Sequence, residues 1–178
     1  MTDLLSAQDW LDQGLKTLAS QGFTALKAEP LAKAIGVSRG SFYWHFADIG
    51  AFHAAILKHW REVAAEAIIA HVEAASAGAD PLIVLLQRVY AEKLALERAV
   101  RSWAVFDASA KAAVQAIDRR RLDYVEGLIR AKGVADDLAQ TRAQILYWAF
   151  LGYALSDKPL SKTQREAVIA ELARIASL

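Results

Sequence analysis

The stretch Gly36-Val37-Ser38-Arg39-Gly40-Ser41-Phe42-Tyr43-Trp44-His45-Phe46 decides how this chain folds. Just before it, residues 29–35 carry Leu31 and Ile35 at the spacing of one helix face. Gly36 can take a positive φ that other residues resist, which permits a tight turn, and Ser38 can cap a second short helix that ends near Phe46. A helix, a tight turn and a second helix in this order predict a helix-turn-helix motif.

The side chains of the second helix divide into two faces. Phe42 and Phe46 are four residues apart, so they share a face and should enter the core. Tyr43, Trp44 and His45 then turn to the opposite side. The second helix of such a motif enters the major groove of DNA, and its polar and aromatic side chains contact base edges and phosphates. Periodicity alone also permits a loop with core aromatic residues here, and it leaves the two interpretations open.

Charge does not help to choose between them. The chain has a net charge of +1, and within residues 1–60 five basic residues are balanced by five acidic residues. Most DNA-binding domains show a basic surface, because neutralising phosphates supplies much of their affinity. DNA binding by this chain would therefore depend on local geometry and should be weak on non-specific DNA.

Composition excludes several other classes of protein. Hydrophobic residues make up 55% of the 178 residues and there are no cysteines, so a large core is possible whereas disulfides, thiolate zinc sites and cysteine nucleophiles are not. The start of the chain is acidic, unlike a secretory signal. The longest uncharged run, residues 143–156, is shorter than the roughly 20 residues that cross a bilayer. We expect a cytoplasmic protein without a membrane partner.

Almost every other segment also has helical periodicity. Ser6 begins a first helix that ends at Gln21-Gly22, and Asp48 begins a long helix that runs to about Ala75. Further helices are predicted over 81–98, from Asp107 or Ser109 to 132, over 137–156 and from 161 to 177, where Ser161 and Gln164 form a capping-box pattern. The prediction is an all-α fold with about nine helices. A helix-turn-helix domain would occupy residues 1–50, linked by helix 48–75, and a helical bundle residues 51–178.

The helix-turn-helix region resembles the DNA-binding domain of the TetR family of transcription regulators. Residues 15–57 carry the resemblance, and the run 36–46 is its most specific part. The positions that agree with the family pattern are Leu15, Leu18, Gly22, Phe23, Leu31, Ala32, Gly36, Val37, Ser38, Gly40, Phe42, Tyr43, Phe46 and Leu57. The resemblance implies a dimeric regulator, usually a repressor, with a variable C-terminal ligand domain. By that match, the DNA contacts are Arg39, Gly40, Ser41, Tyr43, Trp44 and His45.

Two positions depart from the family pattern. Lys27 stands where the family commonly has Ser or Thr as a helix cap, and a lysine cannot accept the capping hydrogen bonds, although it can reach a phosphate. Ile49 stands in the turn where the family commonly has lysine, so one expected phosphate contact is missing. We include Lys27 among the predicted DNA contacts.

The C-terminal part is predicted to supply the dimer interface and the ligand site. Helices 137–156 and 161–177 carry apolar stripes that suit a four-helix bundle with a second copy, although burial within one chain explains such stripes too. An effector pocket lined by aromatic side chains would suit an apolar or aromatic ligand, although core packing is the simpler explanation of each residue. The candidate pocket residues are Tyr90, Trp103, Phe106, Tyr124, Tyr147 and Trp148.

Catalytic and metal chemistry find no support in the sequence. No HExxH motif, phosphate loop or serine–histidine–acid set is present. His59, Glu62 and Glu66 share a helix face, a pattern that is more typical of surface ion pairs than of a metal site. We expect no enzyme and no cofactor. The predicted function is a ligand-responsive repressor that binds a palindromic operator as a dimer. The alternative is a small-molecule-binding or scaffold protein with the same fold and weak or lost DNA binding.

Overall fold

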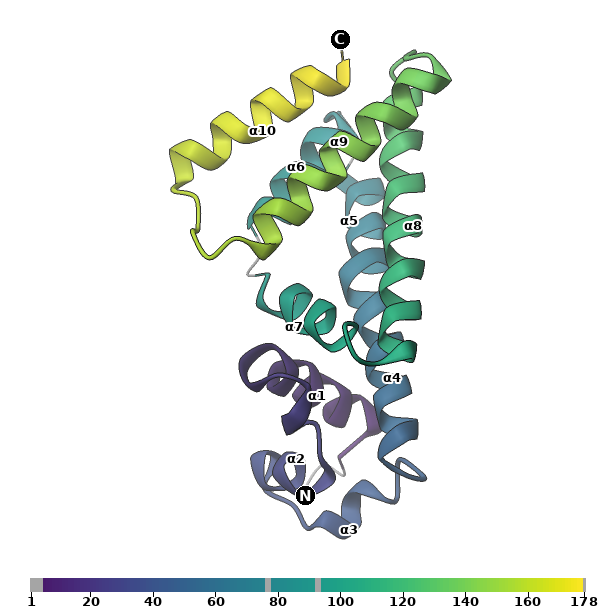
Figure 1. Cartoon of the computed structure of the whole chain (residues 1–178), viewed down its shortest axis with the longest axis vertical. Coiled ribbons are helices and arrows are strands. Elements are labelled where there is room, and N and C mark those ends of the chain that lie inside the picture. Colours follow the sequence, from purple (N-terminus) through teal and green to yellow (C-terminus); the bar gives the residue numbers. More distant parts are fainter. Residues whose placement is uncertain (1–4, 76–77, 92–93, 178) are drawn as a thin grey trace. The chain divides into compact units, whose positions relative to one another are not determined.

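Helices form every regular element in the residues that the computed structural model describes, 5–75, 78–91 and 94–177 (Figure 1). The elements are α1 (Ala7–Gln21), the 3-10 turn η1 (Phe23–Ala25), α2 (Ala28–Ile35), α3 (Arg39–Phe42), α4 (Ile49–Arg61), a π-helical segment (Glu62–Glu66), α5 (Ala67–Ala75), α6 (Pro81–Ala91), α7 (Ala95–Trp103), α8 (Ala108–Arg130), α9 (Asp136–Leu155) and α10 (Lys162–Ser177). Taken with α4, the π segment and α5 as one continuous helix, these are nine helices, which confirms the predicted fold class.

Contacts divide the chain into two compact units. Unit 1 comprises Met1–Glu62 and Ala95–Gln115, and unit 2 comprises Val63–Leu94 and Ala116–Leu178. The sequence predicts a domain boundary at residue 50, because the helix-turn-helix motif ends there. Unit 1 extends beyond it, because α4 and α7 both pack against α1.

The core of unit 1 forms around α1, which begins with a complete capping box. The Ser6 side chain accepts a hydrogen bond from the Asp9 amide, and the Asp9 carboxylate accepts one from the Ser6 amide. Trp10, Leu15 and Leu18 are buried along one side of this helix, where they meet α2, α4 and α7. The helix-turn-helix therefore packs on a hydrophobic core that includes α7, a helix from much later in the chain.

Gly14 marks the closest approach between α1 and α4. A Cβ atom at this position would lie 2.4 Å from Cδ1 of Ile56 and 2.8 Å from Cζ of Phe52. We expect Gly14→Leu to lower the free energy of unfolding by about 1–3 kcal/mol, because an added side chain must displace a packed ring. Urea denaturation measures this, with the exposed Gly127→Leu as the control. Equal stability of the two variants would contradict the close packing.

Two clusters of buried side chains lie in the described part of unit 2. The larger cluster joins α6, α8, α9 and α10, and the smaller one is centred on Tyr147, Phe150 and Ala154 of α9. Ile169, Leu172 and Ala176 of α10 belong to the larger cluster. The apolar stripe of the last helix, predicted to pack against a second copy, is thus buried within one chain. Among the described residues, no helix has the length and apolar character needed to span a membrane.

Two predicted helix boundaries are wrong. The expected helix 81–98 is two helices, α6 and α7, because Leu86 and Tyr90 enter the core of unit 2 whereas Val100 and Trp103 belong to unit 1. The expected helix 38–46 is shorter, since α3 ends at Phe42 and the chain continues in turns. Local periodicity does not reveal either change, because tertiary contacts cause both.

Most of the predicted caps are confirmed. Asp48 accepts a hydrogen bond from the Ala51 amide at 2.7 Å, and Asp107, rather than Ser109, accepts one from the Ala110 amide at 2.7 Å. Ser161 and Gln164 form the predicted reciprocal pair at the start of α10. Ser38 is the exception, since it occupies the N-cap position of α3 but its side chain makes no capping hydrogen bond.

Candidate nucleic-acid interface

A tight turn joins α2 to α3 as the sequence predicts. Gly36 has a φ of 83° in the left-handed region, and its amide donates to the Ala32 carbonyl at 2.9 Å. The Val37 amide donates to the same carbonyl at 3.0 Å. Both bonds go to the Ala32 carbonyl in the last turn of α2, so the turn has a single defined direction. A residue with a Cβ atom at 36 would be strained there.

Phe42 anchors α3 to the core of unit 1. Its side chain is fully buried, and its ring centroid lies 5.3 Å from those of Trp10, Phe46 and Phe52. The prediction that Phe42 and Phe46 point inward is confirmed. Sequence reasoning missed Trp10, although its spacing to Gly14 and Leu18 on the same helix face was a usable signal.

The other side of α3 and the turns that follow are exposed. Trp44 is 88% exposed and Tyr43 is 48% exposed, while His45 is partly buried. Arg39 and Gly40 are exposed, and Ser41 is partly buried. Tryptophan side chains are largely buried in most proteins, so an almost fully exposed one is typical of a surface that contacts a partner. These residues form a continuous segment that is free to contact a partner.

Arg39 is held in position by Tyr43. The guanidinium Nη2 donates to the Tyr43 hydroxyl at 3.2 Å, and the guanidinium carbon lies 5.8 Å from the centre of the Tyr43 ring. This hydrogen bond is the main reason that the pKa of Arg39 lies above its ordinary value, and Glu29 adds a smaller effect. A side chain ordered before binding loses less entropy when it meets a base or a phosphate.

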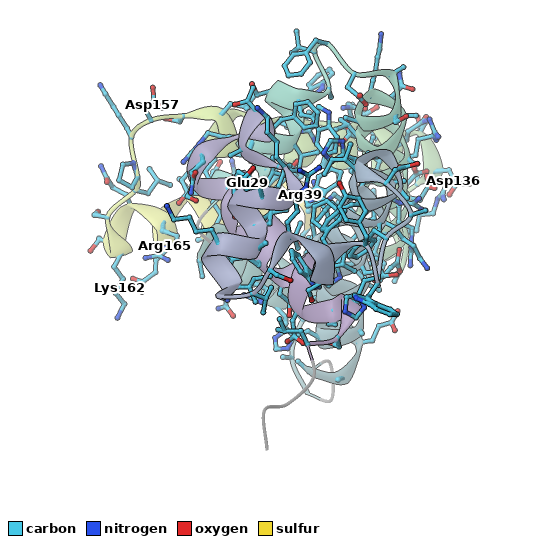
Figure 2. The ribbon with its side chains drawn as sticks, turned by 90° about the horizontal axis from the view of Figure 1, so that it is seen from below. Glu29, Arg39, Asp136, Asp157, Lys162 and Arg165 are labelled. Atoms are coloured by element: carbon cyan, nitrogen blue, oxygen red, sulfur yellow. The ribbon has the colours of Figure 1, made fainter. Side chains whose placement is uncertain are left out.

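Acidic groups accompany these basic ones. Figure 2 views the molecule along its long axis and labels Glu29 of α2 and Arg39 of α3, whose side chains interact electrostatically. Lys27 is exposed at the N-cap of α2 and its side chain makes no capping bond, as expected for lysine. Asp48 caps α4, and Ile49 beside it is 37% exposed. The local charge is therefore close to balanced, in agreement with the sequence.

Glu29 should weaken DNA binding through its proximity to Arg39. We expect Glu29→Gln to raise the affinity for DNA of any sequence by about 2- to 5-fold, because removing an exposed like charge near phosphates is a modest, salt-sensitive effect. Fluorescence anisotropy at two salt concentrations measures it. Glu166→Gln, an exposed acid in α10, is the control. Equal affinities of both variants would show that Glu29 lies away from the DNA.

The six candidate ligand residues do not form one group. Trp103 and Phe106 lie in unit 1, where the Trp103 ring stacks on Phe23 with centroids 4.4 Å apart. The other four lie in unit 2, and two of the six are largely exposed, Phe106 at 65% and Trp148 at 62%. Tyr124 is partly buried, on the side of α8 near Arg120.

Tyr90 and Tyr147 are the two candidates buried in unit 2. The Tyr147 hydroxyl donates to Asp118 at 2.5 Å, and burial, as the largest effect, raises its pKa. The Tyr90 ring stacks on Tyr153 with centroids 4.9 Å apart, but its buried hydroxyl has no hydrogen-bond partner among the residues that the structure describes. An unpaired buried hydroxyl is costly and calls for an explanation such as a bound water or ligand. Tyr90 shares this feature with Trp103 of unit 1, whose buried Nε1 also has no partner among the described residues.

The substitution Tyr90→Phe tests whether the buried hydroxyl of Tyr90 is unpaired. We expect the free energy of unfolding at pH 7 to stay equal or rise by about 1 kcal/mol, since the variant removes an unsatisfied polar group. Burial raises the pKa of Tyr90 to about 12, so its contribution to stability is complete below about pH 10 and is lost as pH rises towards 12. Denaturation curves at pH 9 and 11 should show a smaller alkaline loss for the variant. A marked loss of stability at pH 7 would contradict an unpaired hydroxyl.

The predicted cluster of His59, Glu62 and Glu66 divides into separate contacts. His59 is 8% exposed, its Nε2 lies 2.9 Å from Asp12 Oδ1 and its Nδ1 lies 3.5 Å from a Glu62 carboxylate oxygen. The hydrogen bond with His59 is the largest cause of a lowered pKa of Asp12. Glu66 instead pairs with Arg120. Within the residues described, no group of three potential ligands is placed to hold a metal ion.

Comparison with protein families finds a match at the N-terminus. Residues 11–56 match the model described as bacterial regulatory proteins, tetR family. The matched residues include α2, the Gly36 turn and α3. No curated protein sequence matches the chain.

Solved structures show the same fold over nearly the whole chain. E. coli NemR in its reduced form is 20% identical with a TM-score of 0.74, and the match covers 95% of this chain and 96% of NemR. Salmonella enterica GusR is 17% identical with a TM-score of 0.75, covering 100% of this chain and 98% of GusR. The multidrug binding protein EbrR, solved with imidazole, is 20% identical with a TM-score of 0.61, covering 97% and 96%. At these identities the likeness concerns the fold alone.

Proposed function

We propose that this chain is a member of the tetR family of bacterial regulatory proteins, and that it is a DNA-binding transcriptional regulator, a ligand-responsive repressor that binds a palindromic operator as a dimer. We propose that the chain acts as a regulator rather than as an enzyme. The proposed properties are repression, dimer formation, a symmetric operator and a small-molecule effector. We also propose a cytoplasmic location, where a regulator has access to DNA.

The observation that carries the proposal is the exposed segment on both sides of the buried anchor of α3. Phe42 holds the segment from beneath, and Arg39, Tyr43 and Trp44 extend into solvent. Arg39 is suited to bidentate contact with guanine, and Tyr43 to phosphate contact. Lys27, Gly40, Ser41 and His45 complete the proposed DNA contacts.

Selection from a random-sequence duplex library tests the proposal directly. The expected product is a motif with inverted half-sites whose centres are separated by about one helical turn or a multiple of it, because a symmetric dimer presents two recognition helices. Trp44→Ala serves as the control variant, since it removes an exposed contact without disturbing the core. Recovery of no enriched motif at low salt would favour the alternative, a fold relative that has lost DNA binding.

The dimer is proposed to form through the exposed face of α9, together with the outer side of α10. Leu138, Ile145, Trp148 and Leu155 are 47%, 42%, 62% and 54% exposed, and they recur along one side of α9. An exposed apolar stripe of this length is typical of an interface. The buried stripe of α10 supports each chain from within, so α9 carries most of the proposed contact.

Replacing the exposed Trp148 by glutamate tests the dimer interface without a change in the core. Sedimentation equilibrium should show a dimer for the natural chain and a monomer for Trp148→Glu, because an unpaired charge in an apolar interface is costly. Val105→Glu, at an 85% exposed position in unit 1, is the matched control and should remain a dimer. A dimer in both variants would place the interface elsewhere.

The effector is proposed to be a small apolar or aromatic molecule that binds in unit 2. The unpaired hydroxyl of Tyr90 and the Tyr147–Asp118 pair give an apolar interior a few polar groups, as ligand sites have. EbrR has the same fold and is a multidrug binding protein that holds imidazole. A thermal-shift screen of aromatic amines and phenols should find stabilising compounds, and Tyr90→Phe should reduce their effect.

A further inference from the structure

Arg142 on α9 is a charged side chain without an acceptor in its own chain. It is partly buried, and its Nη1 atom is buried with no hydrogen-bond partner among the residues that the structure describes. It also forms no ion pair with any acidic side chain in that part of the chain. A guanidinium group that is shielded from water costs free energy unless an anion pairs with it. We therefore looked for an acceptor outside the chain.

Arg142 lies beside the exposed apolar stripe that is proposed as the dimer interface. Leu138 precedes it by four residues and Ile145 follows it by three, so the three side chains share one side of α9. Leu138 and Ile145 are 47% and 42% exposed. A second copy packed on this stripe would cover Arg142 as well. An arginine enclosed in this way needs an acidic group on the partner.

Four of the five acidic residues from the start of α9 to the end of α10 already have a role within one chain. Three of them form ion pairs, and these pairs are Asp136–Arg130, Glu166–Lys162 and Glu171–Arg174. Asp137 lies in the first turn of α9, where the helix dipole favours an acidic side chain. The fifth is Asp157, which follows the end of α9.

Asp157 has no such role in its own chain. It is exposed in the connection between α9 and α10, where Figure 2 labels it, and it forms no ion pair with a described residue. The C-terminal end of a helix disfavours a negative charge, and the last turn of α9 has no basic residue to offset it. Asp157 is fifteen positions after Arg142, about 22 Å along a helix. The two side chains of one chain are therefore too far apart to pair.

A twofold axis across two antiparallel α9 helices would bring these two charges together. In such a pair, positions at equal distances on either side of the crossing point lie opposite each other. Arg142 and Asp157 are equally far, about 11 Å along the helix, from the point between Ala149 and Phe150. Gly152 is exposed within one turn of this point, and a Cβ atom built there would meet no packed atom within 4 Å. A second helix can approach closely at such a position.

Other arrangements of two α9 helices bring like charges together. A parallel pair would set Arg142 against the partner's Arg142. An antiparallel pair that crosses at Tyr147 would set Asp157 against the partner's Asp137. Like charges that face each other across an interface disfavour the arrangement that contains them. The charges of α9 thus favour the crossing near Ala149.

We propose that Arg142 of each chain forms an ion pair with Asp157 of the partner subunit, so that two symmetric pairs fix the register of α9 against α9. The inference rests on the proposed dimer and adds to it the residues that determine how the two helices align. The apolar stripe supplies the buried area of the interface. The ion pairs supply its specificity, because they match in one arrangement and repel in others.

Charge reversal at Asp157 is the first test of the pair. Asp157→Arg should raise the dissociation constant of the dimer by at least about 100-fold, because it places a positive charge against each Arg142. Asp157 is exposed and outside any helix, so its replacement should not disturb the fold. Asp123→Arg reverses an exposed acidic residue on α8 and should keep the natural constant. Sedimentation equilibrium measures all three proteins, and an unchanged constant in Asp157→Arg would overturn the pair.

A mixture of two variants distinguishes a pair between chains from a pair within one chain. Arg142→Glu alone should dissociate as Asp157→Arg does. An equimolar mixture of the two variants should form a heterodimer, since each chain then offers the charge that the other chain lacks. Native mass spectrometry distinguishes the heterodimer from the homodimers by mass, and its absence would overturn the proposal. If Arg142→Glu does not fold, the Asp157→Arg result decides.

The double variant Arg142→Glu/Asp157→Arg completes the test. Its dissociation constant should return to within about 10-fold of the natural value, because both pairs are restored with their signs exchanged. A double variant as weak as either single variant would overturn the pair. Failure of the proposed dimer gives a different result, because the natural chain is then a monomer itself. A dimeric natural chain with a dimeric Asp157→Arg variant rejects the ion pair alone.

Discussion

Replacing Phe42 by alanine should lower the free energy of unfolding of unit 1 by about 3–5 kcal/mol. The side chain is fully buried and touches the rings of Trp10, Phe46 and Phe52, so its removal leaves a cavity that three aromatic side chains cannot fill. Because domains are stable by only about 5–15 kcal/mol, much of the stability of unit 1 depends on this residue. Denaturation followed by circular dichroism measures the loss.

Trp44→Ala is the matched control for Phe42→Ala. Trp44 is a larger aromatic residue only two positions away, but it is 88% exposed. We expect its replacement to change the free energy of unfolding by no more than about 0.5 kcal/mol while weakening DNA binding. A comparable loss of stability in both variants would contradict the assignment of Phe42 to the core and Trp44 to the partner surface.

Arg39→Ala should weaken binding to the selected operator by about 10- to 100-fold and should relax the base preference at one position of each half-site. Arg39 is exposed, and the Tyr43 hydroxyl at 3.2 Å orients its guanidinium group before DNA arrives. Tyr43→Ala, in contrast, should weaken binding to all sequences, because a phosphate contact carries no base information. Anisotropy titrations against the operator and its single-base variants measure both effects.

Two further variants make the Arg39 result specific. Tyr43→Phe keeps the ring but removes the hydroxyl that holds Arg39, so it should lower operator affinity by less than Arg39→Ala does. Arg119→Ala removes the same type of side chain from an exposed position in unit 2 and should leave affinity unchanged. If Arg39→Ala reduced affinity for all sequences equally, Arg39 would be a phosphate contact and the assignment of base recognition would be wrong.

The sequence predicted the helix-turn-helix because its determinants are local. Each determinant can be recognised from a few neighbouring residues. These determinants are a glycine with positive φ, helix caps at Ser6 and Asp48, and two phenylalanines four residues apart. The inward direction of Phe42 and the exposure of Tyr43 and Trp44 followed from helical spacing together with the resemblance to the TetR family, because spacing alone left the two interpretations open. These features need no knowledge of distant contacts.

The features that the sequence did not predict depend on distant segments. The break before α7 arises because that helix packs against α1, and the short α3 ends where the Phe42 ring meets the core. The aromatic residues predicted to line one pocket fall in different units, since helical periodicity shows that a side chain is apolar but not which core it enters. The hydrogen bond from Arg121 to the Ala64 carbonyl in the π segment likewise joins positions more than fifty residues apart in the chain.

The charge pattern has a functional consequence that the structure makes specific. Glu29 lies near Arg39, Asp48 caps α4 beside the proposed contacts, and Ile49 supplies no charge. Non-specific binding, which depends on phosphate neutralisation, should therefore be weak, and its dependence on salt should be shallow. Specific binding would then depend on the contacts of one short segment more than in a strongly basic protein.

The central claim is that this segment recognises a particular DNA sequence. The most direct measurement is an anisotropy titration of the natural chain against the selected duplex and against a scrambled duplex of the same composition, both at physiological salt. The account predicts that the selected duplex binds at least about 1,000-fold more tightly, the lower end of the range for specific regulators. Equal affinity for the two duplexes, or no binding to either even at low salt, would contradict it.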